Sequence, residues 1–206
     1  QTSPERISAL CEAVKYINAS SVPGAIVECG VWRGGSMMAA ALTLQRMADE
    51  TRELYLFDTY EGMSAPGDND VALDGSRAAE LLSRQSRDDP MSVWCVSSLD
   101  EVRSNVQTTG YPADRIHYIQ GKVEDTLPQE APDQIALLRL DTDWYESTRH
   151  ELEHLFPRIS PRGVLIIDDY GHWEGARRAV DEYVREHEVP ILLNRIDYTG
   201  RIAVVP

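Results

Sequence analysis

Apolar residues recur along this chain with two different spacings. A spacing of three or four residues, typical of one helix face, predicts helices over residues 4–19, 36–49, 76–85, 99–108, 146–157 and 173–187. Short continuous apolar runs predict buried strands over residues 25–30, 54–57, 115–120, 134–140 and 163–167. Residues 191–196 and 201–205 are expected to pair as a final hairpin through Thr199 and Gly200. Residues 86–95 show no clear pattern.

Strands alternate with helices through most of the chain. This alternation predicts a mostly parallel sheet with helices on both faces, a three-layer α/β sandwich, and the closing hairpin adds an antiparallel strand. No linker or repeat divides residues 1–206, so we expect one domain with an N-terminal helix within residues 1–20. Residues 59–75 are rich in Gly, Pro, Asp and Asn, and they predict a long loop that serves as a lid.

Composition narrows the class of partner. The formal net charge of −14 repels phosphate backbones and anionic lipids, so we expect neither nucleic acid nor membrane as a partner. No apolar run approaches the roughly 20 residues that span a bilayer, and the first residues show no signal-peptide pattern. The three cysteines form no CxxC pair, which indicates a cytoplasmic protein without a disulfide framework. The chain begins without Met, so we expect the native N-terminus to be longer.

Polar residues and glycines stand where the predicted strands end. Ligands of open parallel sheets bind beyond these carboxyl ends. Glu28 and Gly30 end the first strand, and Gly34 and Ser36 open the following helix. The spacing fails the dinucleotide pattern G-x-G-x-x-G, and Glu28 would oppose a pyrophosphate. A cationic ligand suits the segment better, and S-adenosylmethionine carries a positive sulfonium and α-amino group.

Further candidate cofactor contacts stand at three other strand ends. Asp58 ends the second strand, where an acidic residue can accept hydrogen bonds from ribose hydroxyls. Gly121 and Asp141 follow the third and fourth strands. The alternative is a tight turn with ordinary helix capping, which needs no cofactor.

Four aspartates form a second candidate site, because Asp141 and Asp143 follow one buried strand and Asp168 and Asp169 follow the next. Carboxylates gathered this closely repel one another unless they are protonated or bind a cation. Oxygen ligands favour Mg²⁺ or another hard divalent cation. Such a cation could bind a substrate hydroxyl, and a carboxylate outside its ligand set could take the proton. Alternatively, Asp143 and Asp169 cap the helices that follow them.

Asp168 and Asp169 are adjacent, so both can bind one ion only if the strand ends and a turn begins there. His172 follows closely and is a candidate substrate contact or second base, although a lone histidine is usually structural. Trp32, Trp144 and Trp173 also follow strand ends, where they could line a binding site or belong to the core.

Four segments together resemble the macrocin O-methyltransferase family. They are residues 27–36 (VECGVWRGGS), 57–63 (FDTYEGM), 140–147 (LDTDWYES) and 167–171 (IDDYG), in the expected order. The resemblance runs from about residue 22 to the C-terminus and implies a class I methyltransferase fold, which is Rossmann-like. The family methylates sugar hydroxyls of antibiotics with S-adenosylmethionine.

The resemblance also implies residue roles. It places Mg²⁺ on Asp141, Asp168 and Asp169, and it makes Asp143 the general base. Glu28 and Asp58 would contact the cofactor. Family members have a longer N-terminal region that shapes the substrate pocket and dimer contacts, so the acceptor and a homodimeric state both stay open.

The residues alone leave rival functions open. A metal-dependent phosphoryl hydrolase could use the same strand-end carboxylates, although the acidic surface and the Glu28–Asp58 pair argue against it. A non-catalytic cofactor-binding protein would bind S-adenosylmethionine and leave the aspartates without metal. The main interpretation is an O-methyltransferase of a small-molecule hydroxyl on a glycosylated natural product, with a phenolic acceptor as an alternative.

Overall fold

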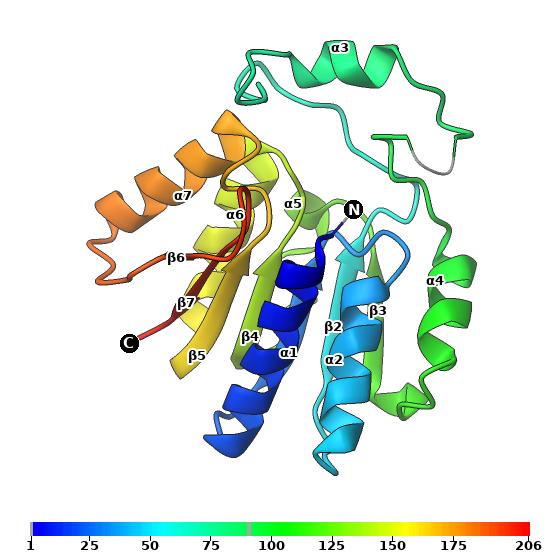
Figure 1. Cartoon of the computed structure of the whole chain (residues 1–206), viewed down its shortest axis with the longest axis vertical. Coiled ribbons are helices and arrows are strands. Elements are labelled where there is room, and N and C mark those ends of the chain that lie inside the picture. Colours follow the sequence, from blue (N-terminus) through cyan, green and yellow to red (C-terminus); the bar gives the residue numbers. More distant parts are fainter. Residues whose placement is uncertain (1, 90–91) are drawn as a thin grey trace.

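The computed structural model describes residues 2–89 and 92–206, and within them one sheet runs through the middle of the molecule (Figure 1). The strand order is β3-β2-β1-β4-β5-β7-β6. The first five strands in this order are parallel, and β7 runs antiparallel to both neighbours. The bounds are β1 Ala25–Cys29, β2 Leu54–Asp58, β3 Ile116–Gln120, β4 Ile135–Leu140, β5 Ile159–Ile167, β6 Asn194–Arg195 and β7 Arg201–Val204. The predicted α/β sandwich is therefore confirmed.

Helices cover both faces of the sheet. One layer packs on one face and comprises α1 (Pro4–Ala19), α2 (Gly35–Arg46) and α4 (Leu99–Gln107). The opposite layer comprises α5 (Val123–Thr126), α6 (Tyr145–Leu155) and α7 (Glu174–Glu186). Alternation along each strand separates the two cores, because Ile26 faces the first layer and Val27 the second. Neither layer contains a helix long and apolar enough to cross a membrane, within the residues described.

The start of α1 shows how local sequence defines an element. Ser3 is the N-cap, and its hydroxyl accepts a hydrogen bond from the amide of Arg6 at 3.2 Å. Pro4 is the first helical residue, where its missing N–H costs nothing. The buried stripe of Leu10, Val14 and Ile17 then packs the helix on the sheet. This helix brings Arg6 to the carboxyl edge of the strands.

Several predicted boundaries were wrong. Strand β5 begins at Ile159, four residues before the predicted start at 163, because the exposed Pro161 and Arg162 hide its apolar pattern. Only Asn194 and Arg195 pair with β7, so residues 191–193 of the predicted hairpin strand lie outside the sheet. Helix α3 is confined to Ala78–Ser83. The short α5 and the 3₁₀ turns Ala113–Arg115 and Phe156–Arg158 gave no periodic signal.

The connection after β2 leaves the sandwich and lies above the carboxyl edge of the sheet (Figure 1). We call residues 59–89 the lid segment; it contains α3. The predicted loop at residues 59–75 is its first part. Trp144 and Trp173, from the sheet side, join Ala72, Ala78 and Leu82 of the lid segment in a third apolar cluster. The lid segment therefore has its own buried contacts with the domain beneath it.

Candidate active site

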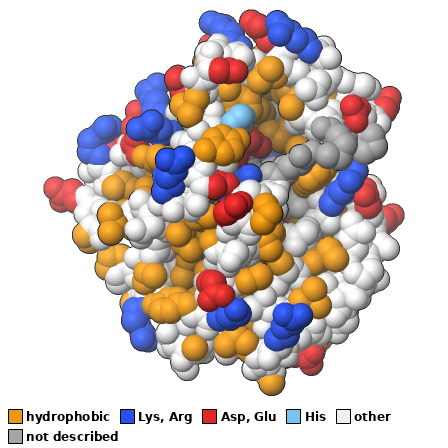
Figure 2. Space-filling view, in the orientation of Figure 1, with side chains coloured by type: hydrophobic (Ala, Val, Ile, Leu, Met, Phe, Trp, Pro, Cys, Tyr) orange, Lys and Arg blue, Asp and Glu red, His pale blue; other side chains and the backbone are white. Residues whose placement is uncertain are grey.

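A cavity of about 440 Å³ lies between the carboxyl edge of the sheet and the lid segment. Figure 2 shows the hollow on one face of the molecule, with charged side chains visible inside it. The cavity brings together these predicted residues: Gly30, Asp58, Gly121, Asp141, Asp143, Asp168, Asp169 and His172. Three other predicted residues, Glu28, Gly34 and Ser36, do not line this cavity, and Glu28 and Ser36 are buried.

The strand ends lie side by side because a glycine ends β1. Gly30 has φ of +83°, and a Cβ atom there would come within 2.0 Å of the carbonyl oxygen of Asp141. The amide of Asp141 in turn donates to the carbonyl of Cys29 at 2.9 Å. Any side chain at position 30 would push these backbones apart. Gly34 is the N-cap of α2, and Ser36 is buried in the first turn of that helix.

Asp58 holds the glycine loop in place. Its Oδ2 accepts hydrogen bonds from the amides of Val31 at 2.6 Å and Trp32 at 3.0 Å. Its Oδ1 accepts from the amide of Tyr60 at 2.7 Å. The Thr59 hydroxyl also donates to Oδ1, at 3.4 Å. These four donors match the roughly four acceptor positions of a carboxylate, so a ligand hydroxyl would replace the long bond from Thr59. The sequence predicted a ligand contact at Asp58 but gave no sign of this structural role.

Glu28 is buried and pairs with an arginine that the sequence analysis missed. Glu28 lies opposite Arg139 of β4 in the strand register, and Arg139 Nη1 donates to Glu28 Oε1 at 2.6 Å. Glu28 Oε2 is also buried and has no partner. Burial raises the pKa of Glu28 to about 7, although Arg139 opposes the shift. A single Arg inside the otherwise apolar segment 135–140 was the available signal.

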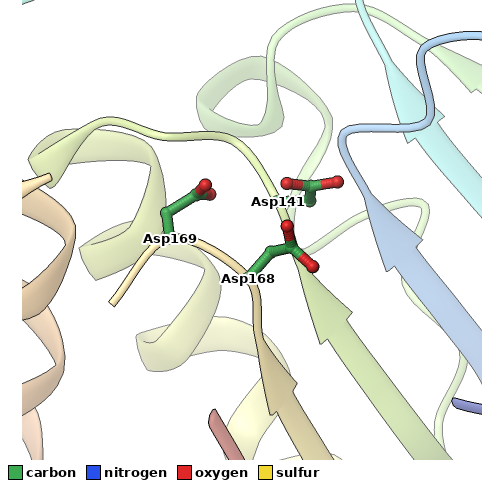
Figure 3. Close-up of side chains that lie close together, drawn as sticks. All are labelled: Asp141, Asp168 and Asp169. Atoms are coloured by element: carbon green, nitrogen blue, oxygen red, sulfur yellow. The ribbon is translucent and has the colours of Figure 1, made fainter. Parts of the chain in front are cut away.

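Three aspartates meet where β4 and β5 end. One carboxylate oxygen from each of Asp141, Asp168 and Asp169 lies within 4.8 Å of the others, and Figure 3 shows the three side chains converging. Strand β5 ends at Ile167, so a turn begins at Asp168 as one shared ion requires. Burial, with nearby carboxylates, raises the pKa values of Asp141 and Asp169 well above the ordinary range.

The aspartate cluster already contacts two cations of the protein. Arg139 Nη1 donates to Asp141 Oδ2 at 2.7 Å, and its Nη2 donates to Asp168 Oδ1 at 2.5 Å. Arg6 of α1 forms an ion pair with Asp168 Oδ2. The oxygen donors and their residual repulsion fit a hard divalent cation. Such a cation would share Asp168 with the two arginines.

Asp143 has an unusual backbone and a defined hydrogen bond. Its φ is +67°, which is uncommon for a residue other than glycine. The indole N–H of Trp173 donates to Asp143 Oδ1 at 2.6 Å, and the Asp143 amide donates to Asp169 Oδ2 at 3.1 Å. Burial, followed by the charge of Asp141, raises the pKa of Asp143 to about 7. A carboxyl group with this pKa can take up a proton near neutral pH.

His172 and the tryptophans also line the cavity. Burial lowers the pKa of His172, and its Nδ1 lies 3.5 Å from the hydroxyl of Tyr198. Trp144 and Trp173 are nearly buried and pack edge to face with ring centroids 5.0 Å apart. They therefore belong both to the core and to the cavity wall, so the two alternatives from the sequence coexist. Trp32 lines the cavity with its indole nitrogen unpartnered.

Comparisons with known proteins identify the family of this chain. The family model described as macrocin O-methyltransferase matches residues 2–203. The chain belongs to this family. It is 35% identical over 196 residues to the 8-demethyl-8-(2,3-dimethoxy-α-L-rhamnosyl)-tetracenomycin-C 4'-O-methyltransferase of Streptomyces olivaceus, covering 95% of this chain and 71% of that protein. It is 33% identical to the demethyldecarbamoylnovobiocin O-methyltransferase of Streptomyces niveus, with the same coverage.

A solved structure shows the same fold. The O-methyltransferase NovP superimposes with a TM-score of 0.85 at 30% identity, covering 98% of this chain and 79% of that one. The chain is therefore an O-methyltransferase of the macrocin family with a class I methyltransferase fold. Family membership sets aside the phosphoryl hydrolase and the non-catalytic binding protein.

The lid segment of this methyltransferase is anchored by one buried carboxylate. Asp70 is 2% exposed, and its Oδ1 accepts from the amide of Tyr145 at 2.8 Å, the first residue of α6. Its Oδ2 accepts from the amide of Gly67 at 2.6 Å. The side chain thus caps a helix whose own N-cap, Trp144, provides no side-chain bond. A Cβ atom at Gly175 would come within 2.5 Å of Asp70 Oδ1.

Backbone hydrogen bonds also attach the lid segment to the domain. The amide of Leu73 donates to the carbonyl of His172 at 3.1 Å, and the amide of Glu174 donates to the carbonyl of Val71 at 2.8 Å. The lid segment therefore contacts the loop that carries Asp168 and Asp169. Sequence reasoning missed Asp70, because an Asp beside Gly67 and Asn69 has the pattern of an ordinary turn residue.

Proposed function

We propose that this chain transfers a methyl group from S-adenosylmethionine to a sugar hydroxyl of a glycosylated natural product, with a divalent cation such as Mg²⁺ at the aspartate cluster. The observation that carries the proposal is the convergence of Asp141, Asp168 and Asp169 beside the glycine loop of β1, with Asp143 in the same cavity. Donor and acceptor machinery thus share one edge of the sheet.

The cofactor half comprises the loop after β1 and its neighbours. The family and fold imply S-adenosylmethionine, which supplies an electrophilic methyl group. The buried Glu28 Oε2 lacks a hydrogen-bond partner, which would suit the positive charge of the donor nearby. Asp58 lines the cavity, and its long bond from the Thr59 hydroxyl could be exchanged for a ribose hydroxyl. Gly34 and Ser36 shape the start of α2, while Gly30, Gly121 and Asp141 line the cavity where backbone can approach the ligand.

The acceptor half comprises the aspartates. Asp141, Asp168 and Asp169 would hold the cation, which supplies positive charge beside the acceptor oxygen and lowers the pKa of its hydroxyl. Asp143 would take the hydroxyl proton. The Trp173 N–H occupies Asp143 Oδ1, so Oδ2 remains as the proton acceptor. His172 contacts the acceptor at the rim of the cavity or serves as a second base.

The rest of the cavity has an apolar wall. Met63, Leu81 and Leu82 of the lid segment line it, as does Trp144 from the domain beneath. Such a wall suits the apolar body of a polyketide or aromatic aglycone, while the carboxylates bind the polar sugar. The Streptomyces olivaceus relative is named for a rhamnosyl substrate, which supports a glycosylated acceptor over a free phenol.

The test is a methylation assay with matched acceptor pairs. The chain, S-adenosylmethionine and Mg²⁺ would be incubated with rhamnosylated aromatic polyketides and with the corresponding aglycones, followed by mass spectrometry of the products. We expect a mass gain of one methylene unit on the glycosides, with the fragment ions placing it on the sugar. Methylation of the aglycones alone would make the enzyme a phenol methyltransferase and overturn the sugar assignment.

A further inference from the structure

Arg139 is a buried cation that touches carboxylates of both halves of the site. Its Nη1 donates to Glu28 Oε1 at 2.6 Å and to Asp141 Oδ2 at 2.7 Å, and its Nη2 donates to Asp168 Oδ1 at 2.5 Å. The side chain is 3% exposed. One guanidinium therefore fixes one oxygen of each of three acidic residues, which come from β1, from the end of β4 and from the end of β5.

The position of Arg139 follows from the strand register. Arg139 lies in β4, between β1 and β5, with Glu28 and Ile166 as its partners on either side. Asp141 directly follows the end of β4, two residues after Arg139, and Asp168 follows the end of β5. The planar fork of an arginine can donate in two directions at once, whereas a lysine ammonium acts as a point charge. The fork reaches the three acceptors from two separate nitrogens, whereas an ammonium would have to reach them all from one.

Under the proposed function, on which this inference rests, the carboxylates on the two sides of Arg139 belong to two different ligand sites. Glu28 is assigned to the cofactor half, and its second oxygen is buried and unpartnered. Asp141 and Asp168 contribute oxygens to the aspartate cluster. Since Glu28 and Asp141 share the same Nη1, a movement of one carboxylate changes the hydrogen bond of the other.

We propose that Arg139 is a positioning residue that couples cofactor binding to divalent-cation binding. A ligand at either site restricts the carboxylate it contacts and therefore restricts the shared guanidinium. The second ligand then meets a side chain that is already ordered and loses less conformational freedom on binding, which gives positive cooperativity. Thermodynamic linkage requires the effect to be equal in both directions.

The experiment measures this coupling by binding alone. Isothermal titration calorimetry gives the Kd of S-adenosylhomocysteine with and without saturating Mn²⁺. The homocysteine form lacks the sulfonium charge, so direct repulsion between the ligand and the cation is small. Electron paramagnetic resonance gives the Kd of Mn²⁺ with and without S-adenosylhomocysteine. We expect each ligand to tighten the other on the order of ten-fold in the wild type.

Arg139→Lys keeps the positive charge and removes the fork. We expect each ligand still to bind this variant on its own. The ratio of its Kd without the other ligand to its Kd with that ligand should fall close to one. The matched control is Arg52→Lys, because Arg52 is a largely buried arginine at the amino edge of the sheet that bonds the carbonyls of Val22 and Gly24. The control should keep the wild-type ratio. A merely structural role for Arg139 would lower the Tm and leave the ratio intact.

A second variant covers the case in which Arg139→Lys does not fold. Glu28→Asp retains the charge but withdraws the carboxylate from Nη1, so Arg139 pairs more fully with Asp141 and Asp168 and competes with the cation. We expect the Mn²⁺ affinity to fall several-fold although Glu28 is not among the cation's ligands. Unchanged Mn²⁺ affinity in this variant would overturn the proposal.

The outcomes separate this inference from the function on which it rests. If the wild type binds both ligands with a ratio of one, or if Arg139→Lys keeps the wild-type ratio, the coupling is wrong and the proposed function stands. If the wild type does not bind Mn²⁺ at all, the cation site of the proposed function fails and the coupling fails with it.

Discussion

The floor and the roof of the cavity differ in the side chains that form them. The floor consists of strand ends, and its acidic side chains are buried, crowded and bonded to Arg139, as at Glu28 and Asp168. The roof is the lid segment, which contributes apolar side chains such as Leu81 and Leu82. Its buried carboxylate Asp70 bonds the first amide of α6. Under the proposed function, the floor carries the chemistry and the roof fits the acceptor.

The largest expected effect comes from removing the cation from the floor. EDTA treatment should reduce methyl transfer to background, because the acceptor hydroxyl would lose the charge that lowers its pKa. Mg²⁺ added in excess should restore turnover, as measured by mass spectrometry of the product. Full activity in EDTA would remove the cation from the proposed function.

The substitution Asp143→Asn should have the second largest effect. The amide cannot take up the acceptor proton, so we expect kcat to fall by about 10²–10⁴. The Kd of S-adenosylhomocysteine should stay unchanged, because Asp143 is assigned to the acceptor half. The control is Asp100→Asn, an exposed aspartate in the first turn of α4. Turnover by Asp143→Asn at the wild-type rate would contradict its role as the base.

A change in the roof should affect acceptor binding more than chemistry. Asp70→Ala removes the acceptor from the Tyr145 amide, and the lost cap should cost about 0.5–2 kcal/mol of folding free energy. We expect the KM for the acceptor to rise several-fold, with a smaller change in the Kd of S-adenosylhomocysteine. Asp74→Ala is the matched control, since Asp74 is an exposed aspartate of the same lid segment. Equal effects of the two variants would show that Asp70 does not anchor the roof.

The smallest expected effect is a pH dependence of stability. Burial raises the pKa of Glu28 to about 7 in the folded chain, above its ordinary value of 4.5. The folded state therefore binds the proton more tightly than the unfolded state, so this stabilisation is full below about pH 4.5 and is lost as the pH rises through about 7. Calorimetry without Mg²⁺ should show this slope in the wild type. In Glu28→Gln, the change in Tm over this pH range should be smaller by a few degrees. An unchanged slope of Tm against pH would contradict the raised pKa.

The sequence predicted the floor better than the roof. Strand ends are predictable from apolar runs, and parallel strands bring their carboxyl ends together, so Asp141, Asp168 and Asp169 could be grouped without a structure. The roles of Asp70 and Arg139 were not predictable in this way. Each depends on contacts between segments far apart in the chain, and a single Asp in a turn or a single Arg in a strand does not identify its partner.

Asp58 and His172 were predicted as site residues from their positions at strand ends, which explains only part of what they do. Asp58 lines the cavity, and its carboxylate also accepts hydrogen bonds from three backbone amides, which hold the glycine loop in place. His172 lies in the lining, and its backbone carbonyl also pairs with the lid segment through Leu73. Side chains and backbone at such positions serve two purposes, and residue type reveals only one of them.

The bare backbone of Gly30 against the carbonyl of Asp141 has a geometric consequence for the reaction. Under the proposed function, the methyl donor lies beside the loop after β1 and the acceptor beside the residues after β4, so a side chain at position 30 would move the two apart. A methyl transfer in line tolerates little extra distance, because the bond must form as the other breaks. The absence of a side chain at position 30 thus sets how closely the two halves of the site can approach.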